Sequence, residues 1–452
     1  MLERTGPSAQ ALRIHDLRLH ADPGRVVLRP FHLGWQSKNA PGGRAQKLVD
    51  DILSLSDEQA EVEYERVRKD FAERHWQTEQ LFQQRFAEVR ENLARDVGDL
   101  SPTRQRLIGA FFCHEYTYAA AALMNPSIIP HPDQSGMSED ACRFVMSLRA
   151  VGEGHISSIA FREGIAKHDG SFELWPQASF ATAMELDDLS LTDSDASVWV
   201  HRQPDSSLSN SVIFPITEQQ SGGLEDLRLT RFDHGDEDYE WIGTYTAYSG
   251  SSIQSELLRT RDFRSIELAP IEGRAGRNKG MALFPEKIGG QYAMLGRQDA
   301  KNLYLLKSDD LETWDEEGTL LMEPLYPWEF IQIGNCGSPI RTEHGWIVFT
   351  HGVGAMRKYA LGCALLDLDD PSKLIGRTRE PVLTAVDAEL VGKAEGGDAV
   401  DDAEIDRLGA PAHHRVHAFD GCVEHFAGRH GVNVEAFIEG SLQRVDIGDM
   451  GE

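Results

Sequence analysis

The sequence is poor in cysteine and in basic residues. Its five cysteines are an odd set without a CxxC pair, which excludes a disulfide framework and argues against a zinc site. Lysine and arginine number 45 against 73 aspartate and glutamate residues, a formal charge of −28. A chain this acidic, with no basic stripe, is a poor partner for nucleic acid or anionic lipid. We therefore expect buried thiols and an uncharged partner such as a sugar.

Long hydrophobic runs are also missing. No apolar run approaches the roughly 20 residues that span a membrane. The first residues, Met1 to Pro7, lack the apolar segment of a secretory signal. The sequence thus predicts a soluble, cytoplasmic protein that does not bind membranes. Its 452 residues exceed the usual size of a single core, so a large domain with a smaller extension is expected.

A repeat of short strand patterns occupies the middle of the chain. The stretch Gly222–Arg228 begins one copy, and comparable stretches follow at a period of about 55 residues, at Asn278–Glu286 and Ile333–Ile340. A less regular copy begins near Asn125. Each copy continues with further strands and a turn, such as the acidic and aromatic stretch 309–314. The pattern predicts an all-β propeller with four visible blades, whose axis is lined by the first strand of each blade.

A helical region precedes the repeat. Apolar residues recur at helical intervals through residues 57 to 97, which predicts one long helix or two shorter ones. Ser56 and Gln59 form a capping box at the start, and Ser101-Pro102 breaks the pattern before a second helical stretch from Thr103 to about Leu123. These helices either pack on the outside of the propeller or present an apolar seam that forms a homo-oligomer.

The end of the chain departs from the repeat. Residues 385 to 452 have little strand pattern and carry an acidic run at 398–406, so we predict no regular fifth blade there. Their histidines lack a metal-ligand spacing, and no metal is expected. The predicted domains are a largely helical extension over 1–118, a propeller over 119–384 and a divergent tail over 385–452. The open side of the ring is then covered by the helices or left as a weak edge.

Several motifs together resemble glycoside hydrolase family 130. They are Glu225-Asp226-x-Arg228, the stretch 278–286, the stretch Thr350–Val353, and the stretches 361–372 and 375–377. The resemblance covers about Met124 to Thr384. It implies a five-bladed propeller that cleaves β-mannosidic bonds with inorganic phosphate as co-substrate, inverts the anomeric carbon and releases mannose 1-phosphate. No cofactor is implied.

Inverting phosphorolysis needs one protein acid, because phosphate itself is the nucleophile. By resemblance, Asp226 is that general acid. The residues implied to bind the sugar are Asn125, Arg149, Glu225, Arg228, Arg297 and Asp299. The residues implied to bind phosphate are Arg261, Asn278, Lys279, His351 and Tyr359. Cations and other donors are the groups that stabilise a bound phosphate dianion.

Two other functions fit the same sequence. An inverting β-mannosidase would place a second carboxylate roughly 6.5–9.5 Å from the acid, to activate a water. A non-catalytic sugar-binding propeller would tolerate the divergent tail better than an enzyme would. At single positions, the Glu225-Asp226 pair can cap a turn, and His351 can be a hydrogen-bonded core residue.

Overall fold

The computed structural model describes residues 19–31, 43–71, 74–75, 77–93, 96–178, 180–186, 197–384 and 443–444. The chain divides into two compact units. One comprises Pro23–Tyr118 with Ala178–Ala183, and the other comprises Met1–Asp22, Ala119–Gln177 and Met184–Glu452. We call them the helical unit and the β unit. No helix among the described residues is long and apolar enough to cross a membrane.

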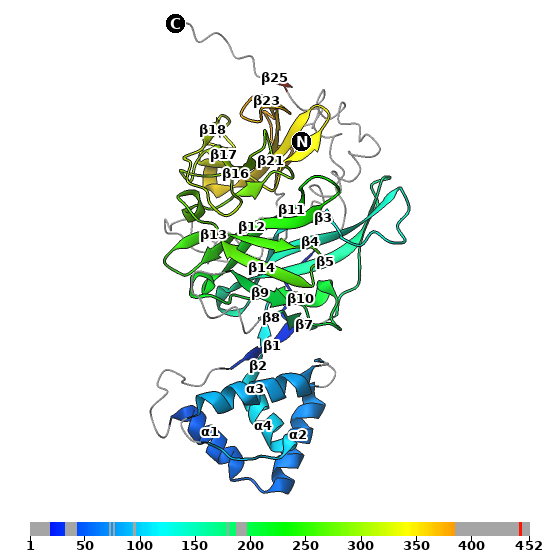
Figure 1. Ribbon diagram of the computed structural model, residues 1–452, viewed down its shortest axis with the longest axis vertical. Helices are drawn as coiled ribbons and strands as arrows, with labels where there is room; N and C mark the ends of the chain where they lie inside the picture. Colours follow the sequence, from blue (N-terminus) through cyan, green and yellow to red (C-terminus); the bar gives the residue numbers. More distant parts are fainter. Residues whose placement is uncertain are drawn as a thin grey trace. The chain divides into compact units, whose positions relative to one another are not determined.

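The described residues of the helical unit form four helices, drawn as coiled ribbons in Figure 1, and three short strands. The helices are α1 (Arg44–Leu53), α2 (Asp57–Phe71), α3 (Thr78–Asn92) and α4 (Pro102–Phe111), and the strands are β1 (Val26–Pro30), β2 (Cys113–Thr117) and β7 (Phe180–Ala183). Val49, Tyr64, Phe86 and Leu107 bring one buried side chain from each helix into a common core.

Arg104 of α4 links three of these helices. Its guanidinium donates to the carbonyls of Ile52 (3.1 Å) and Leu53 (3.2 Å) at the end of α1. It also binds Asp57 at the start of α2 over 2.8 Å. One buried cation thereby satisfies carbonyls that the end of α1 leaves without helical partners.

The helix predictions are partly confirmed. The region 57 to 97 forms two helices, and Ser56 and Gln59 make both hydrogen bonds of the capping box. The prediction of helix from Thr103 to Leu123 is wrong beyond Phe111. There the chain enters β2, which pairs antiparallel with β1 from Val26↔Thr117 to Pro30↔Cys113. A partner strand distant in sequence overrides the local helical pattern.

The β unit is built from four groups of antiparallel strands, numbered in chain order. Group one has β3 (Ala122–Pro130), β4 (Ala141–Val151), β5 (Ser157–Lys167) and β6 (Phe172–Leu174). Group two has β11 (Gly223–Asp233), β12 (Tyr239–Tyr248), β13 (Ile253–Thr260) and β14 (Ser265–Pro270). Group three has β15 (Ala282–Leu283), β16 (Tyr292–Gly296), β17 (Leu303–Ser308) and β18 (Thr319–Met322).

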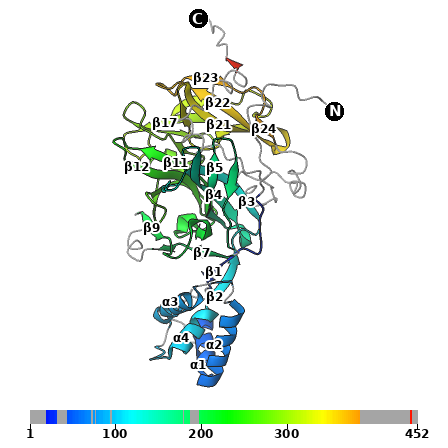
Figure 2. The same cartoon turned by 90° about the vertical axis from the view of Figure 1, so that its right-hand side faces the viewer.

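Group four has β19 (Gln332–Asn335), β20 (Ile340–Thr342), β21 (Gly345–Val353), β22 (Tyr359–Leu366) and β23 (Leu374–Arg377). In Figure 2, β21, β22 and β23 lie side by side, as their pairing requires. Shorter strands are β8 (Glu185–Leu186), β9 (Val198–His201), β10 (Ser211–Ile213), β24 (Leu383–Thr384) and β25 (Gln443–Arg444). The chain is therefore mostly β-sheet with a few helices, and each predicted repeat copy forms one group.

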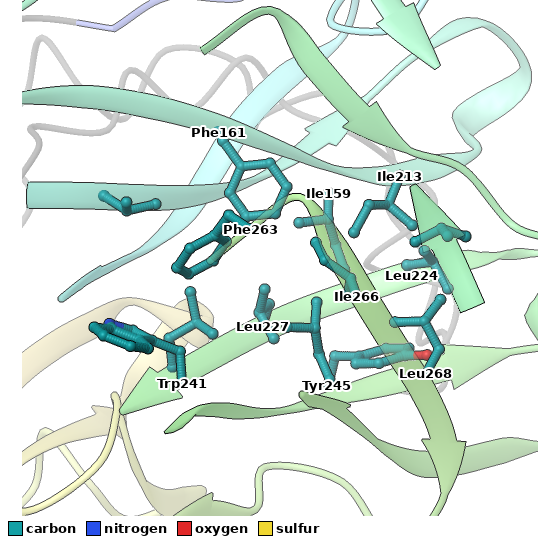
Figure 3. Packing of buried hydrophobic residues seen from close by; sticks show 14 of the residues in the cluster. Ile159, Phe161, Ile213, Leu224, Leu227, Trp241, Tyr245, Phe263, Ile266 and Leu268 are labelled. Atoms are coloured by element: carbon teal, nitrogen blue, oxygen red, sulfur yellow. The ribbon is translucent and has the colours of Figure 1, made fainter. Parts of the chain in front are cut away.

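Apolar layers separate successive groups. The first layer joins Phe161 of group one to Leu227, Tyr245 and Phe263 of group two, as Figure 3 shows. A second layer joins Phe232 of group two to group three, and a third joins groups three and four. Because groups two and three each bury both faces against neighbouring groups, the four groups are stacked face to face.

The predicted turns have a physical cause. Asp262 accepts the backbone N–H of Arg264 over 2.8 Å, and Asp310 accepts that of Glu312 over the same distance. Such Asx turns leave the following aromatic side chains, Phe263 and Trp314, to enter the apolar layers. The strand β5 begins at Ser157, because the preceding residues up to His155 lie in a short 3-10 turn.

The predicted thiols are partly buried. Cys142 and Cys363 are buried, Cys113 and Cys336 are half-buried, and none of these four described residues forms a disulfide. The tail prediction falls on residues 385–442 and 445–452, which lie outside the described residues. Of the tail, β25 pairs antiparallel with β23 at Gly376 and Arg377.

Candidate active site

Two neighbouring strands carry the same irregularity. A β-bulge adds one residue to β3 between Met124 and Ser127, and another adds one to β11 between Glu225 and Arg228. The bulged residues Asn125 and Asp226 have φ values of 51° and 54°. Left-handed φ in residues other than glycine costs about 1–3 kcal/mol and is found most often at functional sites. The bulges therefore mark this end of the two strands as a candidate site.

The two bulged strands are joined directly. Ser127 accepts the backbone N–H of Leu229 through its hydroxyl over 2.9 Å, and both residues are buried. A bulge turns its side chain away from the regular alternation of the strand. The hydroxyl of Ser127 satisfies a backbone donor next to the bulge in β11, so it helps to fix where Asp226 stands.

Arg149 connects both carboxylates of the Glu225-Asp226 pair. It lies on β4 opposite Met124 and is 4% exposed. Its Nη2 atom is 2.7 Å from Glu225 Oε1, and its Nη1 atom is 3.4 Å from Asp226 Oδ1. Its Nε donates to the Ser157 hydroxyl over 2.9 Å. Glu225 is thus held in a buried ion pair, while the Asp226 side chain stays 29% exposed.

Arg228 and Arg297 approach each other across Gly280, the glycine of the Asn-Lys-Gly motif. A Cβ atom at Gly280 would lie 3.1 Å from Arg297 Nε and 3.2 Å from Arg228 Nη1. Gly280 also has a φ of +81°, so both the close approach of the two arginines and the left-handed backbone require glycine at this position. Arg228 donates to the carbonyl of Met281 over 3.3 Å. The buried Nε of Arg297 has no hydrogen-bond partner among the described residues.

Asp226 stands in a positive field. Burial raises the pKa of its carboxyl, but Arg149, Arg228, Lys279 and Arg297 outweigh burial and lower the pKa below its usual value. These cations come from groups one, two and three. In a chain with a formal charge of −28, this local excess of positive charge is a site suited to an anion.

His351 completes the cluster from group four. It pairs with Gly334 of β19, and a Cβ atom at Gly334 would lie 2.6 Å from His351 Cε1 and 2.9 Å from Arg297 Cδ. Burial and then the positive charges of Arg297 and Arg228 lower the pKa of His351 to about 3, against the opposing effect of Asp226. His351 is therefore a neutral imidazole near neutral pH. The ring of Tyr359 lies 6.0 Å from it, between centroids.

Asn278 and Asn125 lie beside this cluster. The side-chain amide of Asn278 donates to Gln298 over 2.7 Å, and its carbonyl accepts the hydroxyl of Ser255 over 2.5 Å. These bonds tie the segment before Lys279 to its neighbours. Asn125 is exposed at its bulge, one residue from Met124, which pairs with Arg149.

Two sequence-predicted residues make other contacts. Arg261 directly follows Thr260, the last residue of β13. Thr260 lies level with Trp241 of β12, which pairs with Arg231 of β11. Arg231 is five positions along β11 from Asp226, so Arg261 lies toward the other end of these strands. There it forms a 2.5 Å ion pair with Asp238. Arg261 thus lies apart from the cation cluster, and its role in binding phosphate stays a prediction. The predicted position was counted from a turn at the far end of the strands.

Asp299 stabilises the turn in which it lies. Its carboxylate accepts the backbone N–H of Lys301 (2.9 Å), the backbone N–H of Asn302 (2.7 Å) and the hydroxyl of Tyr304 (3.0 Å). Both oxygens are engaged, since Asn302 also donates its side-chain amide over 2.6 Å. This arrangement fixes the loop after Arg297 rather than directing a free carboxylate at the cluster.

The structure adds residues that sequence reasoning missed. Ser157 holds Arg149, and Gly334 is the surface on which His351 and Arg297 lie. Gly334 lies in the stretch 333–340 that begins a repeat copy. Its position at the start of an inner strand could have predicted that it lies near the site. No group of three or more potential metal ligands occurs in the described ranges.

Comparison with known proteins shows similarity to one family. Residues 201–395 match the model of glycoside hydrolase family 130 described as beta-1,4-mannooligosaccharide phosphorylase. A beta-1,2-mannobiose phosphorylase of Listeria innocua is 33% identical over 38% of this chain and 49% of that protein. A 1,2-beta-oligomannan phosphorylase of Thermoanaerobacter is 35% identical over 42% of this chain and 62% of that protein. The chain thus spans less than two thirds of the length of either relative.

Solved structures with some similarity to this chain include two glycoside-active proteins. The Listeria innocua beta-1,2-mannobiose phosphorylase, in complex with beta-1,2-mannobiose, is 22% identical with a TM-score of 0.35, over 59% of this chain and 80% of that chain. A putative glycoside hydrolase of Parabacteroides distasonis is 19% identical with a TM-score of 0.44, over 62% and 79%. Residues 201–395, less than half of this chain, are similar to glycoside hydrolase family 130.

Proposed function

We propose that this protein cleaves β-mannosidic bonds with inorganic phosphate and releases α-mannose 1-phosphate by inversion. The observation that carries the proposal is the set of cations around the carboxylate of Asp226. The relatives matched by this chain are named as phosphorylases of mannobiose and oligomannan, which supports the same reaction here.

Phosphate binds between Arg297, Arg228 and Lys279, with His351 and Tyr359 as neutral donors. Arg297 takes the place that the sequence assigned to Arg261. A buried guanidinium with an unpartnered Nε pays a desolvation cost that an anion would offset. Charge-assisted hydrogen bonds to a phosphate oxygen are the strongest that these groups form.

Asp226 is the general acid. The bond between the anomeric carbon and the departing oxygen breaks as that oxygen receives the proton of Asp226, and a phosphate oxygen bonds to the same carbon from the opposite face. In the free protein the cations keep the pKa of Asp226 low. A bound phosphate dianion offsets their charge and raises that pKa, so the acid becomes protonated when its nucleophile is present.

Phosphate is favoured over water as the nucleophile by the state of Glu225. Hydrolysis with inversion needs a second carboxylate as a base across the sugar from the acid. Glu225 neighbours Asp226 on the same strand and is buried in its ion pair with Arg149. Glu225 therefore positions Arg149 and does not act as the base that activates a water.

The architecture proposed for this activity is a five-bladed propeller. Strand groups one to four form four blades over residues 119–384, with a helical extension over 1–118. Each group contributes to the cluster from its inner strands, as the axis of a propeller requires. Asn125 lies on the same side as Asp226 and belongs to the sugar subsite, along with Arg149 and Glu225.

The test is phosphate dependence. The full chain is incubated with β-1,2- and β-1,4-linked mannobiose, with and without inorganic phosphate, and products are followed by phosphorus and proton NMR. We expect α-mannose 1-phosphate in equal amount to the mannose released, and no cleavage without phosphate. Cleavage without phosphate would identify a β-mannosidase. Binding of mannobiose without any product would identify a sugar-binding protein.

A further inference from the structure

The segment Asn278–Met281 carries the lysine of the cation cluster and has no strand pairing of its own. It lies between a short 3-10 turn, Ala275–Arg277, and the start of β15. Asn278 and Lys279 are half-buried, and Met281 is 2% exposed. Backbone carbonyls that are removed from water need hydrogen-bond donors, and this segment receives none from a strand ladder. The side chains that supply these donors therefore fix the position of the segment.

Two buried hydroxyls of group two supply donors at the two ends of this segment. Ser255 of β13 donates to the carbonyl of Asn278 over 2.5 Å. Thr244 of β12 donates to the carbonyl of Met281. Ser255 is 1% exposed and Thr244 is 2% exposed. The two bonds thus join group two to the segment that leads into group three.

Thr244 and Ser255 lie on the same face of the sheet of group two. Thr244 pairs with Leu257 of β13, and Ser255 lies two positions from Leu257 on that strand. Leu257 and Met281 belong to the apolar layer between groups two and three. A hydroxyl in an apolar layer costs free energy unless it is hydrogen-bonded. The two backbone carbonyls of the segment explain why hydroxyl residues occupy these positions.

Thr244 and Arg228 share one acceptor. Arg228 pairs with Thr244 across β11 and β12, directly after the bulge that contains Asp226. The Nη1 atom of Arg228 donates to the same Met281 carbonyl over 3.3 Å. A carbonyl oxygen has two lone pairs, so it can accept both bonds. The Thr244 hydroxyl therefore holds in place the acceptor that orients the guanidinium of Arg228.

The segment also separates two arginines of the cluster. A Cβ atom at Gly280 would lie 3.1 Å from Arg297 Nε and 3.2 Å from Arg228 Nη1, so the backbone of Gly280 lies close to both guanidinium groups. A displaced Gly280 would push against these groups and would move Lys279 with it. The positions of Arg228, Lys279 and Arg297 relative to one another thus depend on this segment.

We propose that Thr244 and Ser255 are positioning residues of the phosphate site, which hold the segment Asn278–Met281 so that Lys279 and Arg228 bind the same anion. This inference rests on the proposed phosphorolysis. Each hydroxyl acts through a backbone carbonyl rather than through a bond to phosphate. Charge-assisted hydrogen bonds depend on geometry, and cations that are held in advance lose less freedom when phosphate binds. Loss of either hydroxyl therefore weakens phosphate binding without removing a charge.

The experiment compares Thr244→Val and Thr244→Ser with wild type. Valine keeps the branched shape of threonine without its hydroxyl, whereas serine keeps the hydroxyl. From initial rates with mannobiose over a range of phosphate concentrations, we expect KM for phosphate to rise about 3–10-fold in Thr244→Val, as loss of one buried hydrogen bond predicts. Thr244→Ser keeps the wild-type value, and Ser255→Ala gives the same rise as Thr244→Val. The KM for mannobiose and kcat at saturating phosphate stay near those of wild type.

The matched control is Thr342→Val, which removes a buried hydroxyl from group four. Thr342 is 6% exposed and donates to the carbonyl of Gly345 over 2.7 Å, at the start of β21 and six residues before His351. The control lowers the melting temperature, as Thr244→Val does, but leaves KM for phosphate unchanged. An unchanged KM for phosphate in Thr244→Val and Ser255→Ala overturns the proposal. An equal rise in Thr244→Ser or in the control overturns it too, because the hydroxyl at position 244 is then not the cause.

Calorimetric titration with inorganic phosphate separates this inference from the proposed reaction, because it needs no turnover. Weaker phosphate binding in Thr244→Val and Ser255→Ala than in wild type supports the positioning role, even where no mannose 1-phosphate is formed. Equal binding in wild type and both variants overturns the inference alone. A wild-type protein that binds no phosphate overturns both the inference and the proposed phosphorolysis.

Discussion

At the scale of single residues, the site is a matter of competing charges. A general acid needs a proton at neutral pH, yet the pKa of Asp226 is lowered by the cations around it. The same cations are what a phosphate dianion requires. In the proposed reaction, a bound phosphate dianion compensates the positive charges that lower the pKa of Asp226. The same cations can therefore bind phosphate and still leave Asp226 protonated when phosphate is bound.

Asp226→Asn tests the acid. We expect kcat to fall by about two to four orders of magnitude, the range for loss of general acid catalysis. Asparagine is nearly isosteric and tolerates left-handed φ, so the melting temperature and the Kd for mannobiose should stay near those of wild type. Asp238→Asn, at the exposed pair with Arg261, is the control and should retain full activity. Full activity in Asp226→Asn would remove this residue from the mechanism.

Arg297→Ala and Arg261→Ala separate the arginine that we propose for the phosphate site from the arginine that the family resemblance implied. Arg297 is buried with an unpartnered Nε, whereas Arg261 is exposed and paired with Asp238. We expect Arg297→Ala to raise KM for phosphate at least about tenfold, since charged hydrogen bonds contribute about 1.5–3 kcal/mol each. Arg261→Ala should leave it unchanged. Initial rates over a range of phosphate concentrations measure both, and the reverse order of effects would restore the sequence-based assignment.

At the scale of elements, the sequence predicts strands well and their ends less well. Strands such as β12 and β21 can be recognised in the sequence, because alternation and flanking turns agree. The strand β2 was not, because it exists through pairing with β1. The motifs predicted Glu225, Asp226 and Arg228 at a strand start, but the bulge that turns Asp226 has no simple sequence signal. The sequence could not show that Arg261 lies apart from the cluster, because motif spacing does not say which end of a strand faces the site.

A buried network supports the entry to β11. Glu256 of β13 accepts the hydroxyl of Tyr245 and the side-chain amide of Gln220, the latter over 2.7 Å. Gln220 lies just before Gly222 and Gly223, which lead into the bulge. Burial raises the pKa of the Glu256 carboxyl, against the effect of these two hydrogen bonds. The folded state therefore favours the protonated form.

Glu256→Gln should flatten the pH dependence of stability. A carboxyl whose folded pKa exceeds its unfolded value stabilises the fold below the unfolded pKa, and this stabilisation is lost as pH rises through the folded pKa. Glutamine does not titrate and still accepts both hydrogen bonds. Urea unfolding at pH 5 and pH 8 should therefore show a smaller loss of stability in Glu256→Gln than in wild type. An unchanged difference between the two pH values would show that Glu256 contributes nothing to it.

At the scale of the whole β unit, the cation cluster joins separate strand groups. Arg149 comes from group one, Arg228 from group two, Arg297 from group three and His351 from group four. Apolar layers hold neighbouring groups together, but at the cluster the positive charges of Arg149, Arg228, Lys279 and Arg297 repel one another. Phosphate replaces that repulsion with attraction to several groups at once.

Phosphate should therefore stabilise the strand groups together. At a concentration ten times its Kd, a ligand that binds only the folded state adds about 1.4 kcal/mol to the free energy of unfolding. Hydrogen exchange followed by mass spectrometry should show slower exchange in β11, the loop after β16 and β21, and no change in α1–α4. Sodium chloride at equal ionic strength is the control for screening. Slower exchange in one strand group alone, or equally slower exchange in the helices, would contradict a phosphate site shared among the groups. Arg297→Ala should abolish the slower exchange, because we propose that phosphate binds at the Nε atom of Arg297.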